Sequence, residues 1–247
     1  MSGNEKSPAI LAESLAKSYR GKPAVVDVSL RVEQGETFGI LGTNGAGKTT
    51  TVEMLAGLRR RDSGTVTVMG LDPQSDRARV RQILGVQLQQ AYLHGALRVW
   101  ELVRLYRSFY PNPRPMDELL EMVGLTEQSN VMFEKLSGGQ QQRLSIALAL
   151  AGRPRVVILD ELTTGLDPKA RRSMWSTIEQ LQDEGVSIVL VSHAMEEVER
   201  LCARVALIDS GRIVALDTPR GLMAQTNTEN LDDAFVALTG RETEEVA

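Results

Sequence analysis

The sequence predicts an α/β fold with a mixed sheet and an inserted block of helices, and three observations lead to this prediction. Apolar segments alternate with amphipathic segments of helical spacing over 153–216, which is typical of a parallel sheet covered by helices. A glycine-rich loop stands between a short apolar strand and a helix. The apolar spacing is helical over 92–152. We therefore expect a core from 1–91 and 153–225, a helical subdomain at 92–152, and a C-terminal helix and tail at 226–247.

In the first part of the chain, the expected elements are separated by turn residues such as Gly21 and Pro23. The pattern predicts strands at 10–19, 25–32, 37–41 and 64–69. It predicts helices at 48–58 and 77–84.

Helical spacing dominates from Leu97 onward, and Pro111 and Pro113 end the first helix of this region. Further helices are expected at 116–123 and 140–151. After them, strands at 156–160, 187–192, 205–209 and 212–216 alternate with helices at 170–184 and 195–201.

Composition limits the possible functions. The 247 residues are 42% apolar and carry a net charge of −4, which argues against a general nucleic-acid-binding protein. A single cysteine, Cys202, excludes an internal disulfide and favours a reducing compartment. The longest apolar runs fall far short of the ~20 residues that span a bilayer, and residues 1–8 lack the apolar stretch of a signal peptide. Work at a membrane would therefore require another chain as the anchor.

The glycine-rich loop fits the phosphate-loop pattern of nucleoside triphosphatases. Its glycines let backbone N–H groups converge on phosphate oxygens, and the following helix N-terminus adds its dipole. Lys48 is expected to reach the β- and γ-phosphates, and the Thr49 hydroxyl to bind Mg²⁺. The alternative is a glycine-rich turn without a ligand. The expected phosphate-binding residues are Gly42, Asn44, Gly45, Ala46, Gly47, Lys48, Thr49 and Thr50.

Two adjacent acids, Asp160 and Glu161, end an apolar strand. The carboxyl end of such a strand lies in the ligand crevice of an open α/β sheet. Asp160 is expected to hold Mg²⁺, through water, and Glu161 to orient or deprotonate the attacking water. Two solvated acids at a strand end are the alternative.

Between these two motifs stands Leu136-Ser137-Gly138-Gly139-Gln140, the sequence LSGGQ. The three motifs in this order resemble the nucleotide-binding domain of the ATP-binding cassette family. The resemblance implies a P-loop NTPase core, ATP and Mg²⁺ as cofactors, and a second copy of the chain. In the family, the LSGGQ of one copy covers the nucleotide of the other, so the nucleotide-contacting residues would include Ser137, Gly138, Gly139 and Gln140. The alternative is a simple helix cap at Ser137.

The resemblance implies four further sites. Gln89 is similar to the Q-loop glutamine that senses Mg²⁺ and the water, with Gln87 and Gln90 as neighbouring alternatives. His193 resembles the switch histidine that contacts the γ-phosphate, or is a surface residue. Tyr19 resembles the aromatic that stacks on adenine, or packs on the sheet edge. Residues 164–167 resemble the D-loop at the dimer interface, where Asp167 is also a natural helix N-cap.

One departure from the family pattern follows Glu161, where Leu162 replaces the usual proline. Leucine restores a backbone N–H and is expected to loosen the turn that places Glu161.

The family resemblance predicts a transport ATPase subunit at the cytoplasmic face of the membrane, with a separate integral membrane partner and no nucleic acid. Six of the ten aromatic residues lie in the helical region, where Tyr92 and Trp100 are candidates for the membrane-subunit interface, while the spacing of Tyr106 and Tyr110 favours the core. Residues 230–242 resemble the tail of multidrug or antibiotic exporters, which implies export of a hydrophobic, drug-like compound. The alternative is a soluble cassette ATPase acting on nucleic acid or ribosomes.

Overall fold

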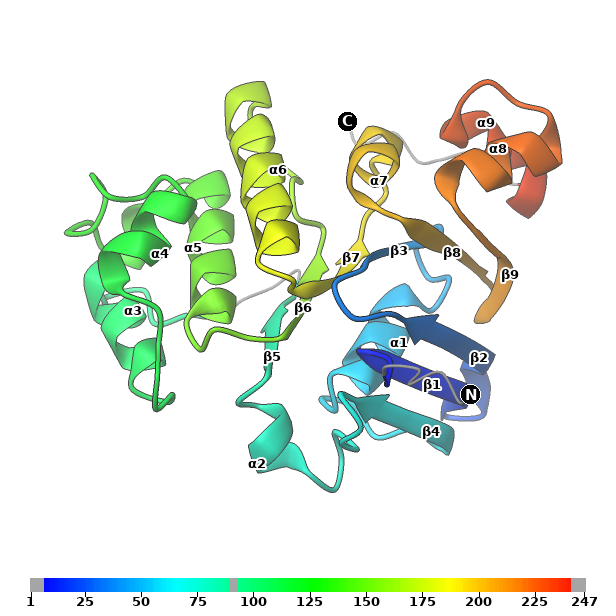
Figure 1. Ribbon diagram of the computed structural model, residues 1–247, viewed down its shortest axis with the longest axis horizontal. Helices are drawn as coiled ribbons and strands as arrows, with labels where there is room; N and C mark the ends of the chain where they lie inside the picture. The colour runs from blue at the N-terminus through cyan, green and yellow to red at the C-terminus, as the bar shows by residue number, and fades with distance from the viewer. Residues whose placement is uncertain (1–6, 89–92, 241–247) are drawn as a thin grey trace, which may run out of the picture.

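The computed structural model describes residues 7–88 and 93–240 and contains two sheets surrounded by helices (Figure 1). The larger sheet has the strand order β5-β6-β7-β3-β8-β9. Its strands are β3 (Thr37–Leu41), β5 (Leu84–Gln87), β6 (Val156–Asp160), β7 (Ser187–Val191), β8 (Arg204–Asp209) and β9 (Arg212–Asp217).

All neighbours in this sheet are parallel except β9, which pairs antiparallel with β8. The central strands are buried on both faces, and successive residues enter two different cores. On β6, for example, Val157 and Leu159 pack into one core, whereas Val156 and Ile158 pack into the other. The mixed, mostly parallel sheet confirms the predicted α/β fold class.

The smaller sheet is antiparallel, with the order β2-β1-β4. Its strands are β1 (Ile10–Tyr19), β2 (Lys22–Val32) and β4 (Ser63–Val68). Helix α1 (Lys48–Leu55) packs against all three strands. Their apolar side chains close the second core, and Figure 1 shows α1 beside this sheet, below β3.

Helices α3 (Val99–Arg107), α4 (Met116–Met122) and α5 (Gly138–Leu150) form the group at the left of Figure 1, and the short η1 (Phe133–Lys135) precedes α5. Buried Val103 and the half-buried Tyr106 and Tyr110 belong to the core of this region, as the spacing predicts. Helix α5 packs against α3, α4 and β5, and so connects this group to the large sheet.

Five further helices are described. They are α2 (Arg77–Val80), α6 (Pro168–Asp183), α7 (Met195–Leu201), α8 (Pro219–Thr226) and α9 (Leu231–Thr239). None of the helices that the structure describes has both the length and the apolar character required to cross a bilayer.

Several predicted boundaries differ from the structure, and elements including β5 and α8 were not predicted. The helix expected at 77–84 ends at Val80, because Leu84 pairs with Val156 as the start of β5. Helix α1 ends near Gly57 (φ +69°), where a Cβ would lie 2.4 Å from the Pro73 carbonyl oxygen. Helix α8 was not expected. Sheet pairing with distant residues decides the first boundary, and local spacing carries no sign of it.

Candidate nucleotide site

The phosphate loop lies between the buried strand β3 and the N-terminus of α1, as predicted. Two of its glycines are required by close backbone approach. A Cβ on Gly42 would lie 2.2 Å from the Ile208 carbonyl oxygen, and one on Gly47 (φ +104°) would lie 2.5 Å from the Ala24 carbonyl oxygen. These contacts with neighbouring strands fix the loop at the carboxyl end of β3.

Lys48 is held inside its own loop. Its Nζ donates to the carbonyl oxygens of Gly42 at 2.7 Å and Thr43 at 3.0 Å. The Ala46 N–H donates to the Thr43 carbonyl at 3.1 Å, and the Ala46 carbonyl accepts from the Gly211 N–H at 2.8 Å. The ammonium group is therefore placed at the mouth of a loop whose shape suits an anion.

Other loop residues predicted to touch phosphate lie toward solvent. Asn44, Gly45 and Thr49 are exposed, and Thr50 is half-buried. With the buried Ala46, they surround the beginning of α1, where the helix dipole favours negative charge.

Asp160 is a buried carboxyl group, with 3% of the residue exposed. Burial foremost, together with the negative charge of Glu161, raises its pKa to about 6, although the positive charge of Lys48 partly opposes the shift. Its Oδ2 has no hydrogen-bond partner among the described residues. A buried carboxylate oxygen of this kind fits a hard cation such as Mg²⁺, with the Thr49 hydroxyl as a second oxygen ligand.

Within the described ranges, no three His, Cys, Asp or Glu side chains cluster to form a metal site made by protein alone. A cation at Asp160 would therefore share its coordination with nucleotide phosphates and water, which is how proteins usually hold Mg²⁺.

Glu161 has an unusual backbone conformation, with φ +54°. Its N–H donates to the Val191 carbonyl on β7 at 2.8 Å, and its carbonyl accepts from Gln142 Nε2 at 3.0 Å. Its Oε1 lies 3.7 Å from Nδ1 of His193, two residues beyond β7. The structure therefore brings Glu161 and His193 together, as expected for two groups that act on one water or phosphate.

Gln87 has a contact that the sequence prediction did not assign. This buried side chain accepts the Asp160 N–H on Oε1 at 3.2 Å and donates to the Leu88 carbonyl at 2.9 Å. A glutamine inside an apolar strand was the available signal. The preferred glutamine, Gln89, lies outside the described residues.

The LSGGQ segment begins α5 with a capping box. Ser137 Oγ accepts the Gln140 N–H at 3.3 Å, and Gln140 Oε1 accepts the Ser137 N–H at 2.9 Å. Ser137 and Gly138 remain exposed, and a Cβ on Gly139 would lie 2.9 Å from Leu166. The cap predicted as the alternative is therefore present, and it leaves the helix N-terminus open to a ligand.

An open pocket of about 490 Å³ lies in front of this helix end. Its walls combine residues 137–140, Gln142 and Arg143 with the segment 164–167 and Ala170, and they include none of the phosphate loop. Asp167 caps α6 through bonds from the N–H groups of Lys169 and Ala170, both 2.9 Å, and these hydrogen bonds, that from Ala170 foremost, lower its pKa. The beginnings of α1 and α5 are thus two separate helix N-termini on one chain, each at the positive end of a helix dipole.

Tyr19 lies at the end of β1 and is 38% exposed. The Arg59 guanidinium carbon is 5.3 Å from its ring centroid, and Lys17 Nζ is 5.8 Å away. The accessible ring suits stacking with a planar base, although two cations already lie over it.

Similarity to known proteins agrees with this geometry. Residues 25–164 match the family model described as ABC transporter. The chain belongs to the ABC transporter family. The chain is accordingly an ATP-binding domain with ATPase activity, which confirms the prediction of an ATPase.

Relatives cover most of the cassette. It is 36% identical to the linearmycin resistance ATP-binding protein of Bacillus subtilis (strain 168), covering 89% of this chain and 72% of that protein. It is 41% identical to Nod factor export ATP-binding protein I of Paraburkholderia xenovorans (strain LB400), covering 87% and 73%.

Solved structures share the fold. An ATP-binding subunit of an ABC transporter superposes with a TM-score of 0.87 at 25% identity, covering 93% of this chain and 99% of that one. A dimeric bacterial cassette gives a TM-score of 0.77 at 27% identity, covering 85% and 98%.

Proposed function

We propose that this cassette is the ATP-hydrolysing subunit of an exporter, and that it acts as a dimer on a separate membrane subunit. The observation that carries the proposal is the similarity over almost nine-tenths of the chain to proteins named for export or antibiotic resistance. The exported compound is, by this proposal, hydrophobic and drug-like, and the cassette works at the cytoplasmic face of the membrane.

The chemistry follows from the site. Lys48 exchanges its two loop carbonyls for β- and γ-phosphate oxygens when ATP enters. Thr49 and Asp160 would hold Mg²⁺, and Glu161 would orient or deprotonate the attacking water. His193 contacts the γ-phosphate from the side of β7, while Gln89 senses the metal and water and Tyr19 stacks on adenine.

Dimerisation explains the open N-terminus of α5. The pocket in front of α5 is separate from the phosphate loop of the same chain, so its natural ligand is the nucleotide of another copy. A cassette with a similar fold has been solved as a dimer, and the same cassette has also been solved as a dimer bound to ADP and Pi. ATP between two copies would then act as part of the interface.

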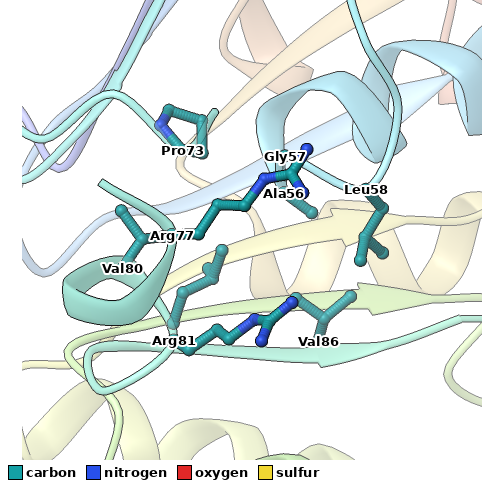
Figure 2. Close-up of a pocket in the computed structure, with 9 residues that line it drawn as sticks. Ala56, Gly57, Leu58, Pro73, Arg77, Val80, Arg81 and Val86 are labelled. Carbon is teal, nitrogen blue, oxygen red and sulfur yellow. The ribbon is translucent and has the colours of Figure 1, made fainter. Parts of the chain in front are cut away.

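The membrane subunit is proposed to dock on a groove between α1, α2 and the helical region. One part, of about 210 Å³, lies between α2 and the end of α1, and Figure 2 shows Arg77 and Arg81 extending from α2 across it. The adjoining part, of about 280 Å³, includes Tyr106 and Tyr110, and Leu58 and Val86 line both parts.

The exposed chemistry of this groove supports a protein partner. Leu58 is 60% exposed, and Phe109, two residues after the end of α3, is 59% exposed. An apolar groove with two arginines extending across one part of it suits an amphipathic helix that carries an acidic residue. Trp100 is half-buried, and Tyr92, the other predicted interface residue, lies outside the described residues.

Purification from detergent-solubilised native membranes tests the proposal, with Leu58→Asp as the matched variant. The wild-type chain should bring down an integral membrane protein that raises its ATPase rate. Leu58→Asp should lose this partner and the stimulation while keeping the ATPase rate of the isolated chain. Recovery of ribosomes or nucleic acid in place of a membrane protein would contradict the proposal.

A further inference from the structure

The peptide units on either side of Glu161 are held by two different elements. Strand β7 accepts its N–H through Val191, and helix α5 binds its carbonyl through Gln142. A glutamate with φ +54° is strained, and such a conformation persists only where the surroundings fix it. Together with a longer bond from the Thr164 N–H to the same carbonyl, at 3.4 Å, these hydrogen bonds hold the backbone that carries the Glu161 side chain.

We propose that Gln142 is a positioning residue that links the LSGGQ surface to the placement of Glu161. This inference rests on the proposed role of Glu161 in hydrolysis. Gln142 would not touch the nucleotide of its own site, and it would act only through the Glu161 carbonyl.

Helix α5 is suited to transmit such a link. It begins at Gly138, and Gln142 lies little more than one helical turn after Gly138. Beyond Gln142 the helix is buried from Leu144 to Leu150. Arg143 further holds its first turns by donating to the carbonyls of Val123 at 2.8 Å and Gly124 at 3.0 Å. A packed helix moves as a unit, so a displacement of its exposed end reaches Gln142.

The consequence concerns both nucleotide sites of a dimer. If the LSGGQ end of α5 contacts the nucleotide bound by the other copy, that contact would change the hydrogen bond of Gln142. It would thereby change the placement of Glu161 in the same chain. Occupancy of one site would thereby adjust hydrolysis in the other. The bond to a backbone carbonyl makes the link independent of the charge state of Glu161.

The first test compares Gln142→Leu, which keeps side-chain size and removes the donor, with Gln180→Leu on the exposed face of α6. Loss of one such bond predicts a turnover rate lowered by about five- to tenfold. Affinity for ATP should change less than about twofold, because the phosphate-binding groups are intact, and the thermal midpoint should stay near that of the control. Turnover at the wild-type rate, or a loss explained by unfolded protein, would overturn the proposal.

The second test is a double-mutant cycle between Ser137→Ala and Gln142→Leu, read as turnover at saturating ATP. A link through α5 predicts that the double variant loses less than the product of the single losses. Independent, multiplicative losses would overturn the link. Glu161→Gln serves as the reference, and full turnover in this variant would refute the proposed role of Glu161. If Glu161→Gln is inactive while Gln142→Leu is fully active, only the positioning role of Gln142 is refuted.

Discussion

Nδ1 of His193 lies 3.7 Å from Oε1 of Glu161, and the two side chains come from the carboxyl ends of adjacent strands. The separation exceeds a hydrogen bond, and contacts of this kind commonly tighten when substrate binds. Strand β7 also pairs with β3, which leads into the phosphate loop. The order of strands in the sheet therefore gathers the groups proposed to act on ATP.

Glu161→Gln should abolish turnover without abolishing ATP binding. The amide keeps the size of the side chain but cannot take a proton, so the hydrolysis rate should fall by about a hundredfold or more. Because ATP then persists, the variant should accumulate as a dimer. Size-exclusion chromatography with and without ATP and Mg²⁺ measures this, and a monomer under both conditions would contradict the proposed nucleotide-dependent dimer.

Lys48→Ala should remove the positive charge that the structure places at the mouth of the phosphate loop. Nucleotide binding or hydrolysis should be lost, which fluorescence titration and phosphate release measure separately. Lys22→Ala, at an exposed lysine of β2, is the matched control and should behave as the wild type. Phosphate release from Lys48→Ala at the wild-type rate would refute the assignment of the loop.

The ion pair between Arg114 and Glu184 should contribute to stability in a pH-dependent way. Arg114 is buried, bonds Glu184 and Glu118, and lowers the pKa of Glu184 chiefly by its hydrogen bond. A carboxyl whose folded-state pKa is depressed stabilises the fold above its unfolded pKa and loses this contribution as pH falls through the folded value. Since the Glu184 side chain is 34% exposed, we expect the ion pair to contribute about 1 kcal/mol to the free energy of unfolding.

Glu184→Gln should therefore lower the free energy of unfolding at pH 7, and its difference from the wild type should shrink as pH falls below about 4. Urea unfolding at several pH values measures this. Glu127→Gln, at an exposed site after α4, should show no such pH-dependent difference from the wild type. A difference that stays constant down to pH 3 would show that the carboxylate charge is not the cause.

Leu162→Pro separates the turn after Glu161 from the core beneath it. Leu162 is completely buried, so its replacement should lower the free energy of unfolding by about 1–3 kcal/mol. Turnover per folded molecule should equal or exceed that of the wild type, because proline stiffens the turn. Urea unfolding and initial rates well below the thermal midpoint distinguish the two effects. A large loss of activity in a fully folded sample would show that leucine has a role in the site.

Several parts of the site could be predicted because their chemistry is local. The loop at 42–49 can be identified from its glycines, lysine and threonine, which stand between a strand and a helix. The acids at the end of β6 and the cap at Asp167 depend on neighbours within a few residues. Other parts depend on distant pairing: β5 exists because Leu84 meets Val156, and Gln87 matters because it meets Asp160.

By itself, the sequence determined the fold class, the family and the residue types available for binding ATP, because glycine turns, caps and apolar periodicity act over a few positions. Only the tertiary structure decided which polar groups meet. It gave the Glu161 backbone hydrogen bonds with both β7 and α5. It also separated the LSGGQ pocket from the phosphate loop of the same chain. The physical reason is that a hydrogen bond such as that from Gln142 to Glu161 joins residues 19 positions apart on different elements, and only packing brings them to 3.0 Å.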